Sequence, residues 1–208
     1  MPIKHILVDI DGTLTSVNIK SGLAKSLTNH FYDLLGRRPE IPNDICISKI
    51  LPQYGVKLED YTKSVLADMS QHTSVRPDAA RFLRYCIDNK KNLYTATTNS
   101  KYISLLKLST GGFEEKDFTG FFGGDSFNDP MGKFSPNFYP CILKALNSDG
   151  SDVIMIGDEW NHDSEPAKKA GIKYTVHIDI NAKEDYIEKD ETYFVNSLDF
   201  VKDIIQNA

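Results

Sequence analysis

Cysteine is scarce in this chain, which has three among its 208 residues: Cys46, Cys86 and Cys141. An odd number of cysteines without metal-type spacing favours free thiols. Cys86 and Cys141 fall on the apolar faces of expected helices, so we expect both thiols to be buried. Free thiols persist in reducing surroundings, so the expected compartment is cytoplasmic.

Long apolar runs and a strong excess of charge are also missing. No apolar run approaches the length of a membrane span. Residues 1–5 lead directly into the first expected strand, so we expect no signal peptide. The 24 basic and 29 acidic side chains give a net charge of −5. Because phosphate backbones are bound by clustered basic side chains, we expect no nucleic-acid partner and no membrane partner. The sequence does not predict the oligomeric state.

The most informative stretch of the sequence is its first apolar run. Ile6 to Val8 form a short continuous apolar segment, typical of a buried strand in a parallel sheet. Asp9 and Asp11 follow, and both leave the strand on the same side because side chains alternate along a strand. Gly12 allows the backbone to turn and to approach a ligand closely. The alternative for Asp11-Gly12 is an ordinary polar turn.

Strands and helices alternate over most of the remaining chain, which predicts an α/β fold with right-handed crossovers and a parallel sheet. Residues 16–75 carry helical periodicity without strand signals, so we expect an all-helical cap inserted after the first strand. The core then comprises residues 1–15 and 76–208. The expected strands are Ile6–Val8, Asn92–Thr98, Phe121–Gly123, Asp152–Gly157, Tyr174–Ile178 and Tyr193–Val195.

Polar side chains follow several of these strands. These are Thr98 and Asn99, Lys133 in the loop after the strand at 121–123, and Asp158 with Asp163. The carboxyl ends of parallel strands meet at one edge of the sheet, where ligands of open α/β sheets bind. We therefore expect these residues to form one site with Asp9 and Asp11.

Such a site suits the transfer of a phosphoryl group to a carboxylate. The two anions repel each other by roughly 4 kcal/mol per pair of unit charges in a partly shielded site, so positive charge has to offset this. Asp9 and Asp158 are expected to hold Mg²⁺, which prefers oxygen ligands. Lys133 supplies a second positive charge to the phosphate.

The remaining members of the expected site handle the phosphate and the proton. The Thr98 hydroxyl and nearby backbone N–H groups complete the phosphate cradle. Asp11 protonates the leaving oxygen and then takes a proton from the water that hydrolyses the aspartyl-phosphate.

Each of these residues also has a simpler interpretation. Thr98 is compatible with a plain strand end, Lys133 with an exposed lysine and Asp158 with a turn. Asp163 is compatible with a helix N-cap, whether or not it also fixes Lys133 or the water ligands of the metal. We assign no role to His162, and Trp160 is compatible with packing or with the site entrance. Four cations are weak candidates for contact with an anionic leaving group: Lys20, Arg37, Arg38 and Arg76.

These motifs, taken together, resemble those of the haloacid dehalogenase (HAD) superfamily. The stretch Asp9-Ile10-Asp11-Gly12-Thr13-Leu14-Thr15 resembles its first motif, which implies a nucleophile at Asp9 and an acid/base at Asp11. Thr98 before Asn99 resembles the second motif. Lys133 within Gly132-Lys133-Phe134-Ser135-Pro136 resembles the third. Gly157-Asp158 with Asp163 resembles the fourth. The match runs in order over nearly the whole chain.

The resemblance implies a Rossmann-like core with helices on both faces of the sheet. It also implies a Mg²⁺ held by Asp9, Asp158 and the backbone carbonyl of Asp11, with the phosphate near Gly12 and Asn99. The helical insert resembles the cap of the phosphoglycolate phosphatase and β-phosphoglucomutase branch. Two features bear on the comparison: His162 stands where the fourth motif often has Asn, and the dehalogenases themselves lack an acid at the place of Asp11.

The function expected from the sequence is therefore a Mg²⁺-dependent phosphatase acting on a small phosphorylated metabolite. Two alternatives stay open. A phosphomutase of the β-phosphoglucomutase type needs the same core residues. A catalytically idle phosphate-binding regulatory protein on this fold has no need of Asp11. The sequence does not name the substrate or the cap residues that contact it.

Overall fold

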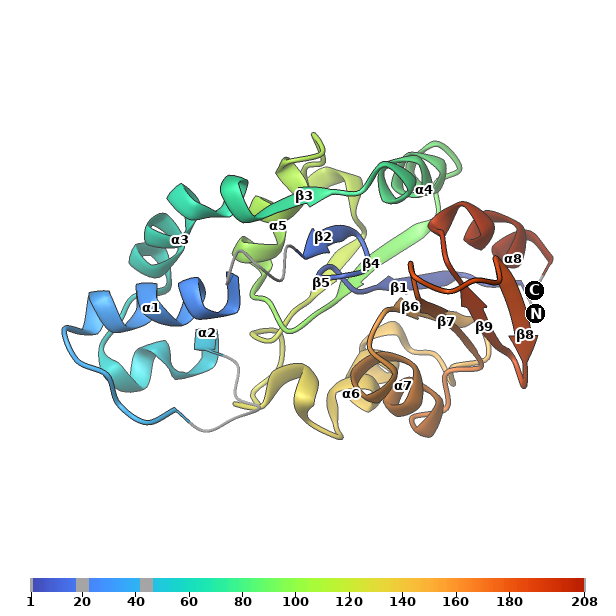
Figure 1. The fold of residues 1–208 in the computed structure, drawn as a ribbon. Helices are drawn as coiled ribbons and strands as arrows, with labels where there is room; N and C mark the ends of the chain where they lie inside the picture. Colours follow the sequence, from blue (N-terminus) through green and yellow to red (C-terminus); the bar gives the residue numbers. More distant parts are fainter. Residues whose placement is uncertain (1, 18–22, 42–46, 208) are drawn as a thin grey trace.

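The computed structural model describes residues 2–17, 23–41 and 47–207, and its centre is a seven-stranded sheet (Figure 1). The strand order is β5-β4-β1-β6-β7-β9-β8, and every neighbouring pair is parallel except the antiparallel pair of β8 and β9. The strands are β1 (His5–Val8), β4 (Asn92–Ala96), β5 (Gly120–Phe122), β6 (Val153–Gly157), β7 (Tyr174–Ile178), β8 (Tyr186–Lys189) and β9 (Thr192–Val195). This confirms the expected α/β class with a Rossmann-like sheet.

Strand β1 lies in the middle of the sheet because its residues are apolar on both faces. Ile6, Leu7 and Val8 are all buried. Ile6 and Val8 pack in one hydrophobic cluster, and Leu7 packs in the other, as the alternation of side chains along a strand requires. Since β1 has strands on both sides, the residues that follow Val8 emerge at the centre of the sheet edge.

Helices cover both faces of the sheet (Figure 1). Buried side chains of α4 and α8 join the cluster that contains Ile6, and those of α6 and α7 join the cluster that contains Leu7. The helices of this part are α4 (Pro77–Asp88), α5 (Lys101–Ser109), α6 (Phe138–Leu146), α7 (Glu165–Lys169) and α8 (Val201–Asn207). Shorter helical turns lie at Leu51–Tyr54, Glu115–Asp117, Gly132–Phe134, Trp160–Ser164 and Leu198–Phe200.

A separate helical block lies beyond the carboxyl ends of the strands, whereas both marked chain ends lie at the opposite end of the sheet (Figure 1). It contains α1 (Leu23–Leu35), α2 (Ile47–Ile50) and α3 (Leu58–His72). Its own hydrophobic cluster includes Phe31, Leu51 and Tyr61, together with Ile103 of α5. The block therefore has a core of its own and rests on α5.

The chain enters and leaves this block through two short strands, which were not predicted from the sequence. β2 (Thr15–Val17) and β3 (Thr73–Val75) pair antiparallel, with Ser16 opposite Ser74. Three-residue strands are too short for a recognisable alternation. Strand β8 was not expected either, because its four residues are all exposed and therefore show no apolar face.

Several minor expectations can now be compared with the structure. Cys86 is a buried free thiol as expected, and Cys141 is free but only half-buried. Cys46 and Lys20 lie outside the described residues. Within the described ranges no helix is both long enough and apolar enough to cross a bilayer.

Candidate active site

The sheet order brings together three chain segments that are far apart in sequence. β1 lies between β4 and β6, and Val8 is in register with Thr95 on one side and Ile156 on the other. The segments that follow these three strands carry Asp9 and Asp11, Thr98 and Asn99, and Asp158. Five of the expected site residues thus emerge at the centre of one sheet edge.

Lys133 lies at this edge and is buried between two carboxylates. Its Nζ is 2.7 Å from Asp9 Oδ1 and 2.5 Å from Asp163 Oδ1. The helical turn Gly132–Phe134 carries the lysine, and the π-helical turn Trp160–Ser164 carries Asp163. All three side chains are almost fully buried, so the interpretation of Lys133 as an ordinary exposed lysine is wrong.

The electrostatics of this trio follow from burial and from the closeness of the charges. Burial raises the pKa of Asp9 well above its ordinary value; the Lys133 ammonium opposes this shift, and the Asp163 carboxylate adds to it. Burial alone would lower the pKa of Lys133, but the carboxylates of Asp163 and Asp9 raise it well above its ordinary value. One lysine charge is therefore shared by two buried carboxyl groups.

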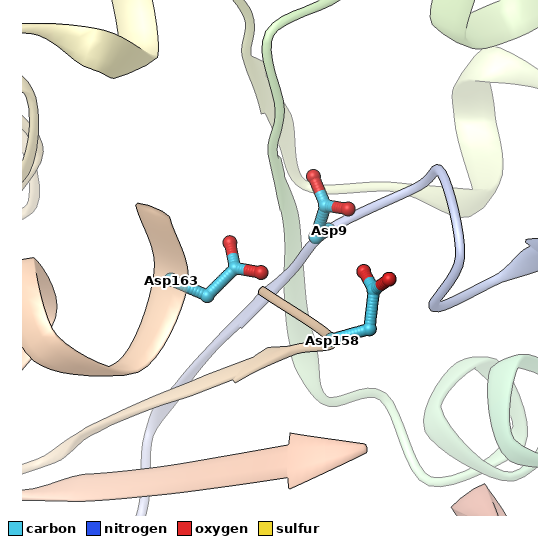
Figure 2. Close-up of side chains that lie close together, drawn as sticks. All are labelled: Asp9, Asp158 and Asp163. Carbon is cyan, nitrogen blue, oxygen red and sulfur yellow. The ribbon is translucent and has the colours of Figure 1, made fainter. Parts of the chain in front are cut away.

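A third carboxyl group joins Asp9 and Asp163. Asp9, Asp158 and Asp163 each offer an oxygen, and these three oxygens lie within 4.8 Å of one another (Figure 2). Burial and the neighbouring Asp163 carboxylate raise the pKa of Asp158 to about 6, and a 3.0 Å hydrogen bond from Thr13 Oγ1 partly offsets that increase. The donors are all hard oxygens, which fits Mg²⁺ or a similar divalent cation and does not fit a metal that prefers sulfur.

The backbone at Gly12 makes room for this cluster. Gly12 has φ +79°, and a Cβ built at this position would lie 2.0 Å from Asp158 Oδ2. Gly157 plays a similar part beside Asp163, because a Cβ there would lie 2.2 Å from Asp163 Cγ. Both glycines let a backbone segment approach a carboxylate more closely than any side chain would permit.

Asp11 lies apart from the cluster and is held by other groups. Lys107 Nζ is 2.6 Å from both of its carboxylate oxygens, and Asn99 Nδ2 donates to Oδ2 at 2.7 Å. Burial would raise the pKa of Asp11, but Lys107 and Asn99 outweigh it and lower the pKa below its ordinary value. Asn99 in turn accepts from Lys107 at 2.9 Å and donates to Thr97 Oγ1 at 2.9 Å.

A cleft of about 730 Å³ opens beside these groups, and its described lining does not include Asp9, Lys133 or Asp163. Among the predicted residues, Asp11, Gly12, Thr98, Asn99 and Asp158 line it. Its other lining residues are Ser16, Leu27, Arg76, Lys107, Glu159, His177, Ile178, Asp179, Ile180 and Asn181. The cleft thus extends from the sheet edge to α1 on one side and to the segment after β7 on the other.

Asp163 is not the N-cap of the helix toward Ala170. Its Oδ2 accepts the backbone N–H of Glu159 at 2.9 Å, inside the π-helical turn. Two other residues of this turn, His162 and Trp160, make contacts that do not involve the carboxylate cluster. His162 Nδ1 lies 2.6 Å from Glu159 Oε2 near the surface. Trp160 stacks on Phe194 with ring centroids 5.9 Å apart, which favours the packing interpretation.

Of the three candidate cations that the structure describes, Arg76 lines the cleft but its charge is already paired, and the other two contact aromatic rings. The Arg76 guanidinium binds Asp78 at 2.8 Å and donates to the carbonyl oxygens of Gly12 and Thr13. Arg37 lies 6.0 Å from the centroid of the Tyr54 ring, and Arg38 lies 5.7 Å from that of Tyr32. The described lining of the cleft includes neither Arg37 nor Arg38.

Sequence reasoning missed Lys107 and the segment after β7. Helix α5 buries Ile103, Ser104, Lys107 and Leu108, so the lysine lies on the apolar face. A lysine at an apolar helical position is a signal that could have identified it. Asp179 and Asn181 follow the predicted strand Tyr174–Ile178, and their polar side chains could have been added to the expected sheet edge by the same rule that identified Asp158.

Comparisons with known proteins bear on the family and the fold. A family model described as haloacid dehalogenase-like hydrolase matches residues 3–171. The comparison with curated proteins found no match. Among solved structures, a HAD phosphatase from Thermococcus onnurineus is 23% identical and has a TM-score of 0.65, with 98% of each chain covered.

Two further structures are similar over nearly the whole chain. A protein provisionally described as a β-phosphoglucomutase, from Thermotoga maritima, is 18% identical with a TM-score of 0.64 and covers 99% of this chain and 100% of its own. The magnesium-bound structure of YfnB, a provisionally assigned HAD hydrolase from Bacillus subtilis, is 13% identical with a TM-score of 0.62 and 99% coverage of both chains. At these identities the structures show a shared fold. The family match over residues 3–171 shows that the chain belongs to the haloacid dehalogenase-like hydrolase family.

Proposed function

We propose that this chain is a Mg²⁺-dependent phosphatase that hydrolyses a small phosphorylated metabolite through an aspartyl-phosphate on Asp9. The observation that supports this most is the position of Asp9, buried at the end of β1 within 2.7 Å of Lys133 and beside Asp158. A carboxylate held next to an ammonium and a candidate cation site suits attack on a phosphorus atom.

In this proposal the first half-reaction moves the phosphoryl group to Asp9. A carboxylate oxygen of Asp9 attacks phosphorus, and the bond between phosphorus and the leaving oxygen breaks. Asp11 donates a proton to that oxygen, for which its carboxyl group has to be protonated against the pKa-lowering contacts of Lys107 and Asn99. Lys133, the Thr98 hydroxyl and backbone N–H groups near Gly12 and Asn99 stabilise the charge on the phosphoryl oxygens.

The second half-reaction hydrolyses the aspartyl-phosphate and regenerates the free Asp9 carboxylate. Asp11, now deprotonated, takes a proton from a water molecule that attacks phosphorus, and the bond between phosphorus and Asp9 breaks. A Mg²⁺ held by Asp9, Asp158 and the backbone carbonyl of Asp11 would neutralise charge that develops on the phosphate. Asp163 holds Lys133 in place, because its Oδ1 lies 2.5 Å from Nζ.

We also propose that residues 16–75 act as the cap of a core formed by residues 1–15 and 76–208. The helical block lies beyond the sheet edge that carries the site, and Leu27 of α1 lines the cleft. The β2–β3 pair connects the two parts through only two crossings of the chain. Closure of the cap would exclude bulk water and select the leaving group.

A phosphatase screen over small phosphorylated metabolites, with and without Mg²⁺, tests the proposal. We expect release of inorganic phosphate that disappears when Mg²⁺ is removed and in the Asp9→Asn variant. Robust hydrolysis by Asp9→Asn overturns the mechanism. Isomerised sugar phosphate without net phosphate release would identify a phosphomutase instead. Retained ligand affinity without turnover in both wild type and Asp11→Asn would identify a regulatory protein.

A further inference from the structure

Lys107 is a buried lysine whose ammonium group contacts two residues, Asp11 and Asn99. Its side chain is 1% exposed, and its Nζ lies 2.6 Å from both Asp11 oxygens and 2.9 Å from Asn99 Oδ1. Asp11 and Asn99 come from the two chain segments that follow β1 and β4, whereas Lys107 comes from α5. One ammonium thus joins three separate elements at the side wall of the cleft.

Stability alone does not account for a lysine at this position. Moving an ammonium out of water costs several kcal/mol, and an apolar residue of similar volume is often neutral or stabilising in its place. The neighbouring helical positions Ile103 and Leu108 are buried apolar residues, so methionine or leucine at position 107 would continue the same packed face. The position of the charge points to a task at Asp11.

Of the two partners of Lys107, Asp11 is the more exposed, because Asn99 is buried. The Asp11 side chain is 31% exposed, and it lines the cleft together with Lys107 and Asn99. Lys107 contacts both oxygens and Asn99 contacts one, so two donors fix the plane and the direction of the carboxylate. A free aspartate would rotate about its side-chain bonds and lose this direction.

We propose that Lys107 is a positioning residue, which together with Asn99 fixes the Asp11 carboxylate toward the cleft for proton transfer to the leaving group. This inference rests on the proposed function. Lys107 does not touch the phosphate in this account, and it acts only through Asp11.

The proposal predicts an effect that depends on the leaving group. Phenyl phosphate and p-nitrophenyl phosphate have rings of similar shape, but nitrophenolate departs readily without a proton and phenolate departs less readily. General acid catalysis contributes about 10² to 10⁴-fold where it is needed. In Lys107→Met, kcat/KM for phenyl phosphate should fall by roughly 10-fold or more, and kcat/KM for p-nitrophenyl phosphate by less than about 3-fold.

The Asp11→Asn background separates positioning from general structural damage. If Lys107 acts through Asp11, Lys107→Met should cause no further loss of kcat/KM for phenyl phosphate in that background. The double variant carries neither charge, so it remains informative even if Lys107→Met alone folds poorly. Lys144→Met, at an exposed position of α6, is the matched control and should keep wild-type kinetics on both substrates.

Equal losses on both substrates, an additive loss in the double variant, or faster turnover of phenyl phosphate in Lys107→Met would each overturn the inference. These outcomes are distinct from failure of the proposed function, in which Asp9→Asn keeps the phosphatase activity of the wild type. If Asp9→Asn is inactive and Lys107→Met matches wild type on both substrates, only the role of Lys107 is overturned.

Discussion

Three carboxyl groups and one ammonium group meet at the end of β1. Asp9, Asp158 and Asp163 are brought within reach of one ion, and Lys133 compensates only part of their charge. In the described part of the chain no lysine or arginine pairs with Asp158, which accepts a hydrogen bond from the Thr13 hydroxyl instead. A divalent cation would neutralise the remaining negative charge of the cluster. Without a cation, the ionised Asp158 carboxylate lowers the stability of the folded state.

Asp158→Asn should therefore stabilise the metal-free protein at neutral pH. The Asp158 pKa of about 6 in the folded protein lies above the ordinary aspartate value of about 3.8. The stabilising effect of this group is therefore fully present below pH 3.8 or so and is lost as pH rises through about 6. In chelator at pH 7.5 we expect the variant to exceed wild type by roughly 1–2 kcal/mol in free energy of unfolding, since partial exposure reduces the effect.

Urea denaturation at a series of pH values measures this difference. The gap between the variant and wild type should narrow as pH falls from 7.5 to 4.5. If the difference in free energy of unfolding widens over that range, or if the variant is less stable than wild type at pH 7.5, the ionised Asp158 carboxylate does not destabilise the metal-free protein.

Some residues of the candidate site could be predicted from the sequence, and others could not. Asp9, Asp11 and Asp158 follow buried apolar strands directly, so their common location could be predicted from strand order alone. Lys107 lies on a helix, and its partner Asp11 is 96 positions away. Only a three-dimensional contact assigns it to the site, although its place on an apolar helical face was a visible anomaly.

At the scale of elements, the turn after β1 connects the strand to the acidic cluster of Asp9, Asp158 and Asp163. Gly12 adopts φ +79° there and packs against Asp158, while Arg76 donates to its carbonyl oxygen from the start of α4. The turn thus links the first strand, the fourth motif and the return of the chain from the helical block. Its geometry depends on the absence of a side chain.

Gly12→Ala should impair catalysis much more than folding. Its Cβ would meet Asp158 Oδ2 at 2.0 Å, so the carboxylate has to move, and a displacement of about 1 Å can cost roughly 100-fold in turnover. Gly36→Ala is the matched control, since Gly36 has φ +69° with open space around it. It should cost about 1 kcal/mol in stability and change turnover less than twofold.

Phosphate release at saturating Mg²⁺, together with thermal unfolding, distinguishes these two variants. Similar turnover in Gly12→Ala and Gly36→Ala would mean that the close approach of Gly12 to Asp158 has no part in the chemistry.

Buried strands could be predicted from the sequence, whereas exposed or very short strands could not. The strand at 153–157 is apolar and buried throughout, and four of the five residues of the strand at 174–178 are buried. Both strands lie close to their expected bounds. β8 was missed because all four of its residues are exposed, and β2 and β3 because each has only three residues. Tertiary pairing, rather than local pattern, determines those three strands.

At the scale of the whole molecule, the candidate site lies between two separately packed parts. The sheet with its covering helices supplies the charged groups, and the helical block with its own core faces them across the cleft. The order of the motifs could be predicted from the sequence. The shape of the cleft could not, because the segment after β7 and α1 contribute to it only through folding.

Mg²⁺ should stabilise the whole molecule if the acidic cluster binds it. A ligand present at about 100 times its Kd adds about 2.7 kcal/mol to the stability of the folded state, which for a chain of this size corresponds to roughly 5–10 °C in Tm. Differential scanning fluorimetry with a Mg²⁺ titration measures the shift. Asp158→Asn should show little or none of it, and an equal shift in that variant would place the ion elsewhere.

The most direct test of the central claim is to locate the phosphoryl group during turnover. The protein is mixed with p-nitrophenyl phosphate and Mg²⁺, quenched in acid and digested, and the peptide that contains Asp9 is analysed by fragmentation mass spectrometry. We expect one phosphoryl group on Asp9, at higher occupancy in Asp11→Asn because water attack then lacks its base, and none in Asp9→Asn or without Mg²⁺. Phosphate release with no phosphorylated Asp9 peptide in wild type and in Asp11→Asn would contradict the account.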